Sequence, residues 1–483
     1  MTSPVLPAEL EALLAIEAWP AGLDAAVAAA EGWTDAEDVR LACRRNRVRD
    51  LLGGDERAQR DLARALESVA TQRSARSLAA ARRAAARVLD HLQLDPHAVR
   101  LAVTGGLRRM APRIERVELL ATSDEPTALG NALREARFVA SSRIEGDTVH
   151  ARLVDGTAVT LRVLPEDAAR FVVAHVESTG PAAFVDGLRE RARLQGLAWN
   201  AALGGLPTHV PLETEADLFA ALDLAPVPPE RRAAVARGEP IGLLVEAADV
   251  RGLAALHAAH GAGRFPLVTL ADTAAAQGFA WLLVADHVRG ADPRAGREML
   301  AAQREEAMAW RRRRSDVDDE QDAPALPDVL LGARIPLEHV TALPEADLVI
   351  GVPTASDWPA AACDALATGQ LDVLAPPPRT AAGADDLRAW GAVIDAARDA
   401  GAAVAFGGEG TSAAPPFGVG ALLVQASVPV LLDADETMPG ELDQLLAALG
   451  QARREAVPAP LVLNAWSAAR LRTWVATRRE RTT

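Results

Sequence analysis

A glycine turn followed by two arginines is the stretch of this sequence best suited to chemistry. Gly105 and Gly106 separate one apolar stretch from Arg108 and Arg109, and a second apolar stretch begins near Val117. The N–H groups of a glycine turn can donate to phosphate oxygens, and arginine can pair with the same oxygens. The residues therefore predict a phosphate-binding turn. The alternative is that both arginines are solvated or pack against a sheet.

The residue types present limit the chemistry that the chain can perform. The sequence contains no lysine and no tyrosine, so Schiff-base chemistry on lysine is excluded and arginine carries the cationic work. A net charge of −15 argues against indiscriminate adhesion to nucleic acid or anionic membranes, although a local basic groove is compatible with it. Cys43 and Cys363 lie far apart and predict neither a disulfide framework nor a cysteine zinc site.

Length and composition predict a protein of several domains. A chain of 483 residues exceeds one ordinary core and should form roughly two to four domains. Apolar residues make up 49% and charged residues 24%, which is typical of globular proteins. No apolar stretch reaches the length of a membrane helix, and the N-terminus lacks the features of a signal peptide. A cytoplasmic protein without membrane contact is the simplest interpretation.

Residues 1–98 predict a helical region, because apolar residues recur at helical spacing. One of its helices is expected from Ser77 to Leu92 and carries Arg82, Arg83 and Arg87. Three arginines on a helix usually form a solvated face, so we expect these side chains to be exposed rather than to contact phosphate.

Residues 99–165 predict a small mixed α/β sheet. Strands are expected at residues 101–103, 117–121 and 138–141, with a helix at residues 127–135. Residues 149–164 alternate between apolar and polar on both sides of Asp155-Gly156, which predicts a hairpin. Helices are expected again from residue 166 to about 222, in a unit that ends near residue 238.

From Pro240 the pattern changes to alternating strands and helices. Strands are expected at residues 281–285, 328–331, 347–351, 371–375, 402–406, 428–432 and 460–463. Such a series predicts parallel strands joined by helices, either as a βα barrel or as an open sheet. Residues 419–432 are expected to form two buried strands, and the four arginines at positions 311–314 are expected in a surface loop.

Several motifs together resemble the bacterial family X DNA polymerases that carry a C-terminal PHP phosphoesterase domain, over roughly residues 5–480. The glycine turn of that family reads Gly-Ser-aromatic-Arg-Arg and precedes an Asp-x-Asp strand. Here the corresponding residues are 105–109, followed by Arg116-Val117-Glu118. The thumb motifs of the family correspond to Thr179-Gly180-Pro181 and to the Leu-Arg-Glu-Arg-Ala sequence at residues 188–192.

The second half carries the PHP part of the resemblance. The family begins this domain with Asp-x-Arg-Gly-Asp-Leu-His-x-His and continues with Thr-Asp-His. The chain has a matching stretch at residues 249–257, and then Ala285-Asp286-His287. The resemblance implies a helical N-terminal domain (1–98), a nucleotidyltransferase palm (99–165), a thumb (166–238) and a PHP-like βα barrel (240–483).

The resemblance also implies that the polymerase carboxylates are mostly missing, because their positions hold Arg116, Glu118 and Thr160. Two-metal phosphoryl transfer needs converging carboxylates, and alternate residues of a strand share one face. We therefore expect no useful polymerase activity, and we expect Arg116 and Glu118 to form a surface ion pair. The candidate nucleotide- or phosphate-binding residues are Gly105, Gly106, Arg108, Arg109, Thr179 and Gly180.

In the barrel, the resemblance implies a metal site with most of its ligands substituted. His257, His287 and Asp433 are retained and Asp435 replaces a histidine, so these four could hold one weakly bound Mn²⁺, Zn²⁺ or Mg²⁺ if they converge. The other ligand positions hold Ala255, Ala262, Arg334, Thr354 and Pro376. The alternative, which we favour, is a set of remnants held by hydrogen bonds, with no resident cofactor. His260 is expected at the surface.

Three functions follow from these residues. The leading hypothesis is a catalytically inactive protein that keeps the polymerase scaffold and binds DNA, a nucleotide or a repair protein. The second is a residual metal-dependent phosphoesterase or 3′–5′ exonuclease that uses His257, His287 and Asp433. The third is a protein–protein adaptor that uses its acidic surface. The sequence does not rank these partners, and it leaves the oligomeric state open.

Overall fold

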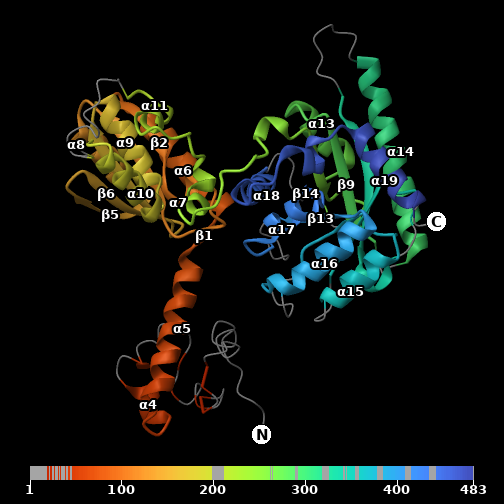
Figure 1. Ribbon diagram of the computed structural model, residues 1–483, viewed down its shortest axis with the longest axis horizontal. Helices are drawn as coiled ribbons and strands as arrows, with labels where there is room; N and C mark the ends of the chain where they lie inside the picture. The colour runs from red at the N-terminus through yellow and green to blue at the C-terminus, as the bar shows by residue number, and fades with distance from the viewer. Residues whose placement is uncertain are drawn as a thin grey trace.

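The computed structural model combines a five-stranded mixed sheet, a group of short helices and a closed barrel of seven parallel strands (Figure 1). The described residues are 19–20, 22–23, 27, 31, 33, 39, 42–43, 46–197, 199, 212–261, 263, 265–288, 292–317, 326–340, 343, 345–353, 358–377, 384–407, 415–434 and 442–481. The α/β class expected from the sequence is confirmed. The C-terminal strands form a barrel and not an open sheet.

The described part of the N-terminal region is mainly helical. Its elements are α4 (Arg47–Leu51), α5 (Glu56–Ser74), β1 (Arg76–Ser77) and α6 (Leu78–Gln93). Ser77 ends the short strand and caps α6, because its Oγ accepts the N–H of Ala80 at 3.0 Å. The expectation of helix throughout is wrong at β1, which pairs antiparallel with β3 (Arg113–Ile114). The exposed face of α6 carries Arg82, Arg83 and Arg87, as expected.

The mixed sheet follows α6. Its remaining elements are β2 (Ala98–Val103), α7 (Gly105–Arg108), β4 (Val117–Ser123), α8 (Pro126–Arg134), β5 (Val139–Glu145), β6 (Thr148–Leu153) and β7 (Ala158–Pro165). The strand order is β2-β4-β7-β6-β5, and only the β4–β7 pair is parallel. The hairpin predicted around Asp155-Gly156 is confirmed as β6–β7.

The two faces of this sheet differ. Val117, Leu119 and Leu161 point into a core shared with α6 and α8. On the opposite face, Leu120 is covered by α9 (Ala168–Thr179), whereas Thr160 lies on the part that α9 leaves open. The period of two along each strand explains this division, because successive side chains point to opposite faces.

A group of short helices connects the sheet to the barrel. It contains α9, α10 (Ala182–Leu194), α11 (Glu215–Ala221), η2 (Pro229–Arg231) and α12 (Arg232–Val235). Asp167 caps α9 by accepting the N–H of Arg170, and Thr214 forms a capping box at the start of α11. Phe184 and Phe219 pack in the core of this group.

The barrel occupies the C-terminal half. Its strands are β8 (Gly252–Leu256), β9 (Trp281–His287), β10 (Asp328–Pro336), β11 (Leu348–Val352), β12 (Val373–Leu374), β13 (Ala403–Gly407) and β14 (Val430–Asp433). Neighbouring strands follow the order β10-β11-β12-β13-β14-β8-β9 and close the circle.

Helices surround the barrel strands. They are α13 (Leu267–Ala276), α14 (Pro293–Val317), α15 (Trp358–Ala367), α16 (Leu387–Ala400), α17 (Val419–Ala426), α18 (Asp443–Arg454) and α19 (Ala468–Glu480). Apolar side chains, including Trp358 and Trp390, fill the layer between these helices and the strands.

Three expectations for the barrel are wrong. Residues 419–426 form α17 and not a strand, because a short apolar run has the same composition in a buried helix and a buried strand. The arginines at 311–314 lie within α14, since no glycine or proline occurs between Gly296 and Pro324. Residues 459–465 form the 3₁₀ turns η6 (Ala459–Leu461) and η7 (Leu463–Ala465), next to Pro458 and Pro460, which cannot donate to a ladder.

Among the described residues, no helix is both long enough and apolar enough to cross a membrane.

Candidate functional site

The glycine turn begins α7 beside the carboxylate of Glu118. Gly105 has a φ of +60°, and a Cβ at this position would lie 1.7 Å from Glu118 Oε2. Both the backbone conformation and the carboxylate therefore require glycine. The backbone N–H of Gly106 donates to the Glu118 carboxylate. A carboxylate of the protein itself thus uses a donor that a phosphate would need.

Arg109 is the main cation near Glu118. Burial raises the pKa of Glu118, and the charges of Arg109 and Arg116 together with the Gly106 N–H oppose this shift. Burial lowers the pKa of Arg109, which donates its Nη1 to the carbonyl of Thr179. The expected surface ion pair between Arg116 and Glu118 is wrong: both side chains are described, and the structure does not join them. The Glu118 carboxylate accepts the Gly106 N–H instead, and Arg116 acts on it through its charge alone.

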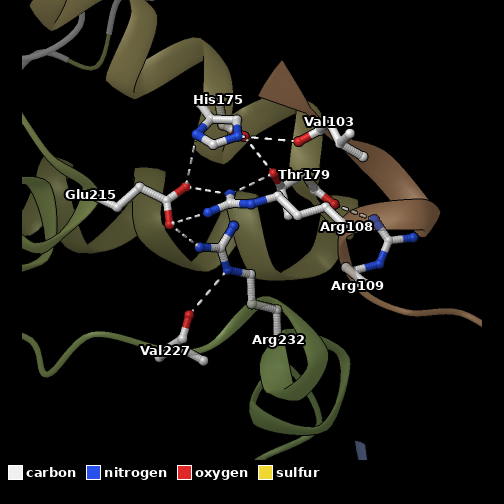
Figure 2. A network of polar contacts seen from close by, with 8 residues as sticks. All are labelled: Val103, Arg108, Arg109, His175, Thr179, Glu215, Val227 and Arg232. Carbon is white, nitrogen blue, oxygen red and sulfur yellow. Dashed lines mark hydrogen bonds and ion pairs between the residues drawn. The ribbon is translucent and has the colours of Figure 1, made fainter. Parts of the chain in front are cut away.

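Arg108 is held by a carboxylate from α11 (Figure 2). Its Nη1 and Nη2 donate to the two oxygens of Glu215 at 2.5 and 2.9 Å, and Nη1 also donates to Thr179 Oγ1 at 2.9 Å. Arg232 Nη2 donates to Glu215 Oε2 at 2.8 Å and is fully buried. The contact of Arg108 with both oxygens of Glu215 is bidentate, which is the strongest form of arginine–carboxylate pairing. It ties α7 to the short helices.

His175 completes this network in a neutral form. Its Nε2 lies 3.2 Å from the Val103 carbonyl, and its Nδ1 lies 3.6 Å from Glu215 Oε1. Burial, and then the charge of Arg108, lower the pKa of His175 to about 4. Burial alone would raise the pKa of Glu215, but the Arg108 hydrogen bond and the Arg232 charge bring it below its usual value. Glu215 is therefore ionised and His175 is neutral at neutral pH.

We call Gly105, Gly106, Arg108, Arg109, Thr179 and Gly180 the glycine-turn site. The structure brings these residues together, because Arg108 and Arg109 both contact Thr179 and a Cβ on Gly180 would lie 3.3 Å from Arg109 Nη1. Their role in phosphate binding stays a prediction. Sequence reasoning missed the partners Glu215, His175 and Arg232, for which only the Thr214 capping box gave a local signal.

The three positions that the resemblance assigns to polymerase carboxylates lie on one open face. Glu118 and Thr160 are direct neighbours across β4 and β7, and His150 Nδ1 lies 3.4 Å from Thr160 Oγ1. A shallow hollow of about 310 Å³ on this face is lined by Arg116, Ser141, Ser142, Arg143, His150, Ala151, Arg152, Ala158, Val159 and Thr160. Three arginines line this hollow, where metal chemistry would need carboxylates.

Four of the barrel residues that the resemblance assigns to metal-ligand positions lie on, or directly after, four neighbouring strands. Asp433 ends β14, His257 follows β8, His287 ends β9, and Arg334 on β10 pairs in register with His287. These residues share the C-terminal end of the strands, where βα barrels usually hold their chemistry. The rings of His257 and His287 stack with centroids 5.6 Å apart. We call His257, His287, Arg334 and Asp433 the barrel mouth.

Arg334 reaches across the barrel mouth to Asp433. Its Nη2 lies 2.8 Å from each carboxylate oxygen of Asp433, and the two side chains are 5% and 4% exposed. The resemblance implies a metal ligand at position 334. The Arg334 guanidinium therefore supplies a positive charge next to Asp433, as a bound metal ion would. A buried carboxylate needs such a partner, because an unpaired buried charge is strongly unfavourable.

Asp286 is a buried carboxylate beside the barrel mouth that the sequence analysis did not select as a candidate site residue. It is completely buried and accepts hydrogen bonds from the Ala258 N–H at 3.2 Å and from Gln303 Nε2 at 2.7 Å. Its Oδ1 lies 3.4 Å from His257 Nδ1, within ion-pair distance when this histidine is protonated. A Cβ on Gly261 would lie 2.3 Å from this carboxylate. The Ala285-Asp286-His287 motif was the sequence feature that could have identified Asp286.

The described residues of the barrel mouth do not by themselves make a metal centre. Within the described ranges, no group of three or more histidines, cysteines and carboxylates is arranged to hold an ion. Asp435, Ala262 and Thr354 lie outside the described residues, so the predicted set of His257, His287, Asp433 and Asp435 stays a prediction. His260 Nε2 donates to Glu306 Oε2 at 2.8 Å, and its side chain is one-third exposed, as expected of a surface residue.

Two further ligand positions are described. Ala255 is buried in β8 with a φ of +65°, an uncommon conformation for a residue other than glycine, and Pro376 follows β12. Neither side chain can ligate a metal.

The described residues form a mixed α/β protein with a closed barrel of seven parallel strands at its C-terminal end. The chain is similar to the DNA polymerase/3′–5′ exonuclease PolX of Bacillus subtilis, with 22% identity over 268 residues. The match covers 53% of this chain and 46% of the relative, so the chain spans less than half the length of that protein. No protein-family model matches the chain. This distant similarity supports a PolX-like relationship.

Proposed function

We propose that the chain is a PolX-like, DNA-associated protein whose polymerase and phosphoesterase sites no longer catalyse phosphoryl transfer. The contact between Arg334 and Asp433 is the observation that carries this proposal. A guanidinium that donates to both oxygens of a retained ligand competes directly with a metal ion for that ligand.

The sheet supports the same proposal through a second substitution. Only Glu118 remains of three carboxylate positions, and its carboxylate accepts the N–H of the glycine turn. Losing one metal clamp removes several kcal/mol of transition-state stabilisation, and about 1.4 kcal/mol already changes a rate tenfold. We therefore expect neither nucleotide incorporation nor exonuclease activity with Mg²⁺ or Mn²⁺.

DNA association would use the open face of the sheet. Arg116, Arg143 and Arg152 line the shallow hollow there, and arginine binds phosphate without a bridging metal. Arg143 also contacts Glu145 at 3.0 Å, a surface ion pair that costs little to exchange for a phosphate.

Fluorescence anisotropy with a labelled gapped DNA, titrated at several salt concentrations, tests DNA association. The variant R116Q/R143Q/R152Q should weaken binding and lower the salt dependence by about one phosphate contact per lost arginine. The matched control is R82Q/R83Q/R87Q on the exposed face of α6. No binding of the unaltered protein at low salt would refute DNA association, and equal effects of both triple variants would refute this surface.

A residual metal-dependent phosphoesterase is the second candidate. It is favoured by the stacked His257 and His287 and by Asp286 beside them. Metal analysis of the purified protein decides between the two candidates. Bound Mn²⁺ or Zn²⁺ that is lost in H257A/H287A, together with phosphodiester hydrolysis, would replace the first proposal with this one.

A further inference from the structure

A cavity lies at the junction of the sheet, the short helices and the barrel. Its volume is about 430 Å³, within the range of roughly 300–1,000 Å³ that small-molecule sites occupy. The sheet region contributes Leu78, Pro112 and Arg113, the short helices contribute residues around Glu230, and the barrel contributes residues of α18 and of the segment before α17. Figure 1 shows α18 facing the sheet region at this junction. Domain junctions are preferred places for ligand sites.

The wall of this cavity is mainly apolar and contains one aromatic platform. Pro415, Pro416 and Phe417 come from the barrel, and Leu78 and Pro112 come from the sheet region. Phe417 is 53% exposed although it is a large apolar side chain. The guanidinium of Arg237 lies 4.8 Å from the centre of its ring. Such a wall favours a flat ring, which aromatic and guanidinium planes can stack against.

Two buried acceptors in the wall favour a ligand that carries N–H donors. Gln451 Oε1 and Glu230 Oε2 are buried and accept no hydrogen bond from the described residues. The other atoms of these groups are engaged, because Gln451 Nε2 donates to the Pro415 carbonyl at 2.8 Å and Glu230 Oε1 accepts from Arg453 at 2.9 Å. A buried acceptor without a donor is costly, so a donor that reaches either oxygen from the cavity would be stabilising.

Arg454 supplies a positive charge to the same cavity. It donates its Nη1 to the Met110 carbonyl, and the charges of Glu455 and Glu230 act on it, although neither carboxylate forms a direct ion pair with it among the described residues. Burial lowers the pKa of Arg454 to about 10, so the guanidinium still carries its charge at neutral pH. Burial also raises the pKa of Glu455, which accepts the N–H groups of Gly418 and Gly420. Perturbed ionisable groups in a cleft are typical of ligand sites.

We propose that this junction cavity binds a planar, amino-bearing heterocycle that carries an anionic group, such as a nucleoside monophosphate. The ring would lie against Phe417, its amino groups would donate to Gln451 and Glu230, and the anionic group would pair with Arg454. This site is separate from the glycine-turn site and from the open face of the sheet. The proposal therefore does not depend on DNA association.

Calorimetric titration of the full chain with AMP, GMP, CMP, UMP and inorganic phosphate, in the presence of EDTA, tests the proposal. At least one nucleotide should bind more tightly than inorganic phosphate. F417A and R454Q should each weaken this binding by about tenfold or more, because each removes one of the main contacts. The matched controls are L94A, which removes another exposed apolar side chain, and R82Q, which removes an exposed arginine; both should leave binding unchanged.

Several outcomes would overturn this proposal. They are the absence of nucleotide binding, binding that neither cavity variant affects, and inorganic phosphate binding as tightly as the nucleotides. If R454Q does not fold, F417A and its control L94A still test the proposal. Phe417 is half-exposed, so its replacement should leave the fold intact. Anisotropy titrations with gapped DNA on F417A separate this test from the proposed function, since DNA association should be unchanged in that variant.

Discussion

The glycine-turn site and the barrel mouth both balance a charge by an ion pair within the protein, but the balanced charge is positive at the turn and negative at the mouth. At the turn, cations and N–H donors remain, and the carboxylates of Glu118 and Glu215 satisfy them. At the mouth, a carboxylate remains, and the guanidinium of Arg334 satisfies it. In both places the charge of a side chain is balanced by an opposite charge of the protein itself. The comparison shows that a buried charge requires a partner of opposite sign.

The two ion pairs differ in burial, and this difference determines how easily each pair can separate. Arg334 and Asp433 are 5% and 4% exposed, whereas Arg108 and Glu215 are 22% and 20% exposed. A deeply buried pair cannot exchange its partner for water at low cost. We therefore expect the barrel mouth to be the more rigid site and the glycine-turn site to be the more adaptable one.

The largest expected effect is on the barrel mouth. R334M leaves the Asp433 carboxylate buried without its cation, which should lower the free energy of unfolding by about 3–5 kcal/mol. Urea unfolding monitored by tryptophan fluorescence measures the change, because Trp281, Trp358 and Trp390 are buried in the barrel. The double variant R334M/D433L should recover most of the loss. A double variant as unstable as R334M would mean that the charge pair is not the cause.

A smaller effect is expected at the glycine-turn site. E215Q weakens the acceptor of Arg108 and Arg232 and should lower the free energy of unfolding by roughly 1–3 kcal/mol. The matched control is E213Q, which changes an exposed glutamate two residues earlier. Urea unfolding of both variants measures the difference. If E215Q matched E213Q, the network would contribute nothing measurable to stability.

The pH dependence of stability should separate the two sites further. The pKa of His175 falls from 6.5 to about 4 on folding, so the unfolded chain binds this proton more readily. Stability should therefore decrease as the pH falls from about 6.5 toward 4, and the lowered pKa of Glu215 adds a further loss below about 4.5. H175Q should flatten the upper part of this curve, because it removes the group whose pKa changes most there. An unchanged slope in H175Q would contradict this assignment.

The smallest expected effect concerns metal removal. Because Arg334 holds both oxygens of Asp433, EDTA should leave the thermal unfolding temperature unchanged, and added Mn²⁺ should not raise it. Differential scanning calorimetry checks both results. Stabilisation by Mn²⁺ that disappears in H257A/H287A would show that the barrel mouth binds metal despite the arginine.

Sequence patterns predicted the fold more successfully than the partners of the site residues. The β6–β7 hairpin and six of the barrel strands were expected, because alternating and apolar runs are local signals. The pattern failed at α17, where eight residues have no distinguishing period, and at Pro458 and Pro460, where proline prevents a strand.

Local sequence by itself determined the glycine turn, the alternation of strands and the arginine-only cationic chemistry, since these depend on residue types and short spacings. Tertiary structure alone decided which charges meet. Arg108 pairs with Glu215 across 107 residues, and Arg334 pairs with Asp433 across 99 residues. Electrostatic partners are set by distance in space and by burial, and neither quantity can be read from separations of this size along the chain.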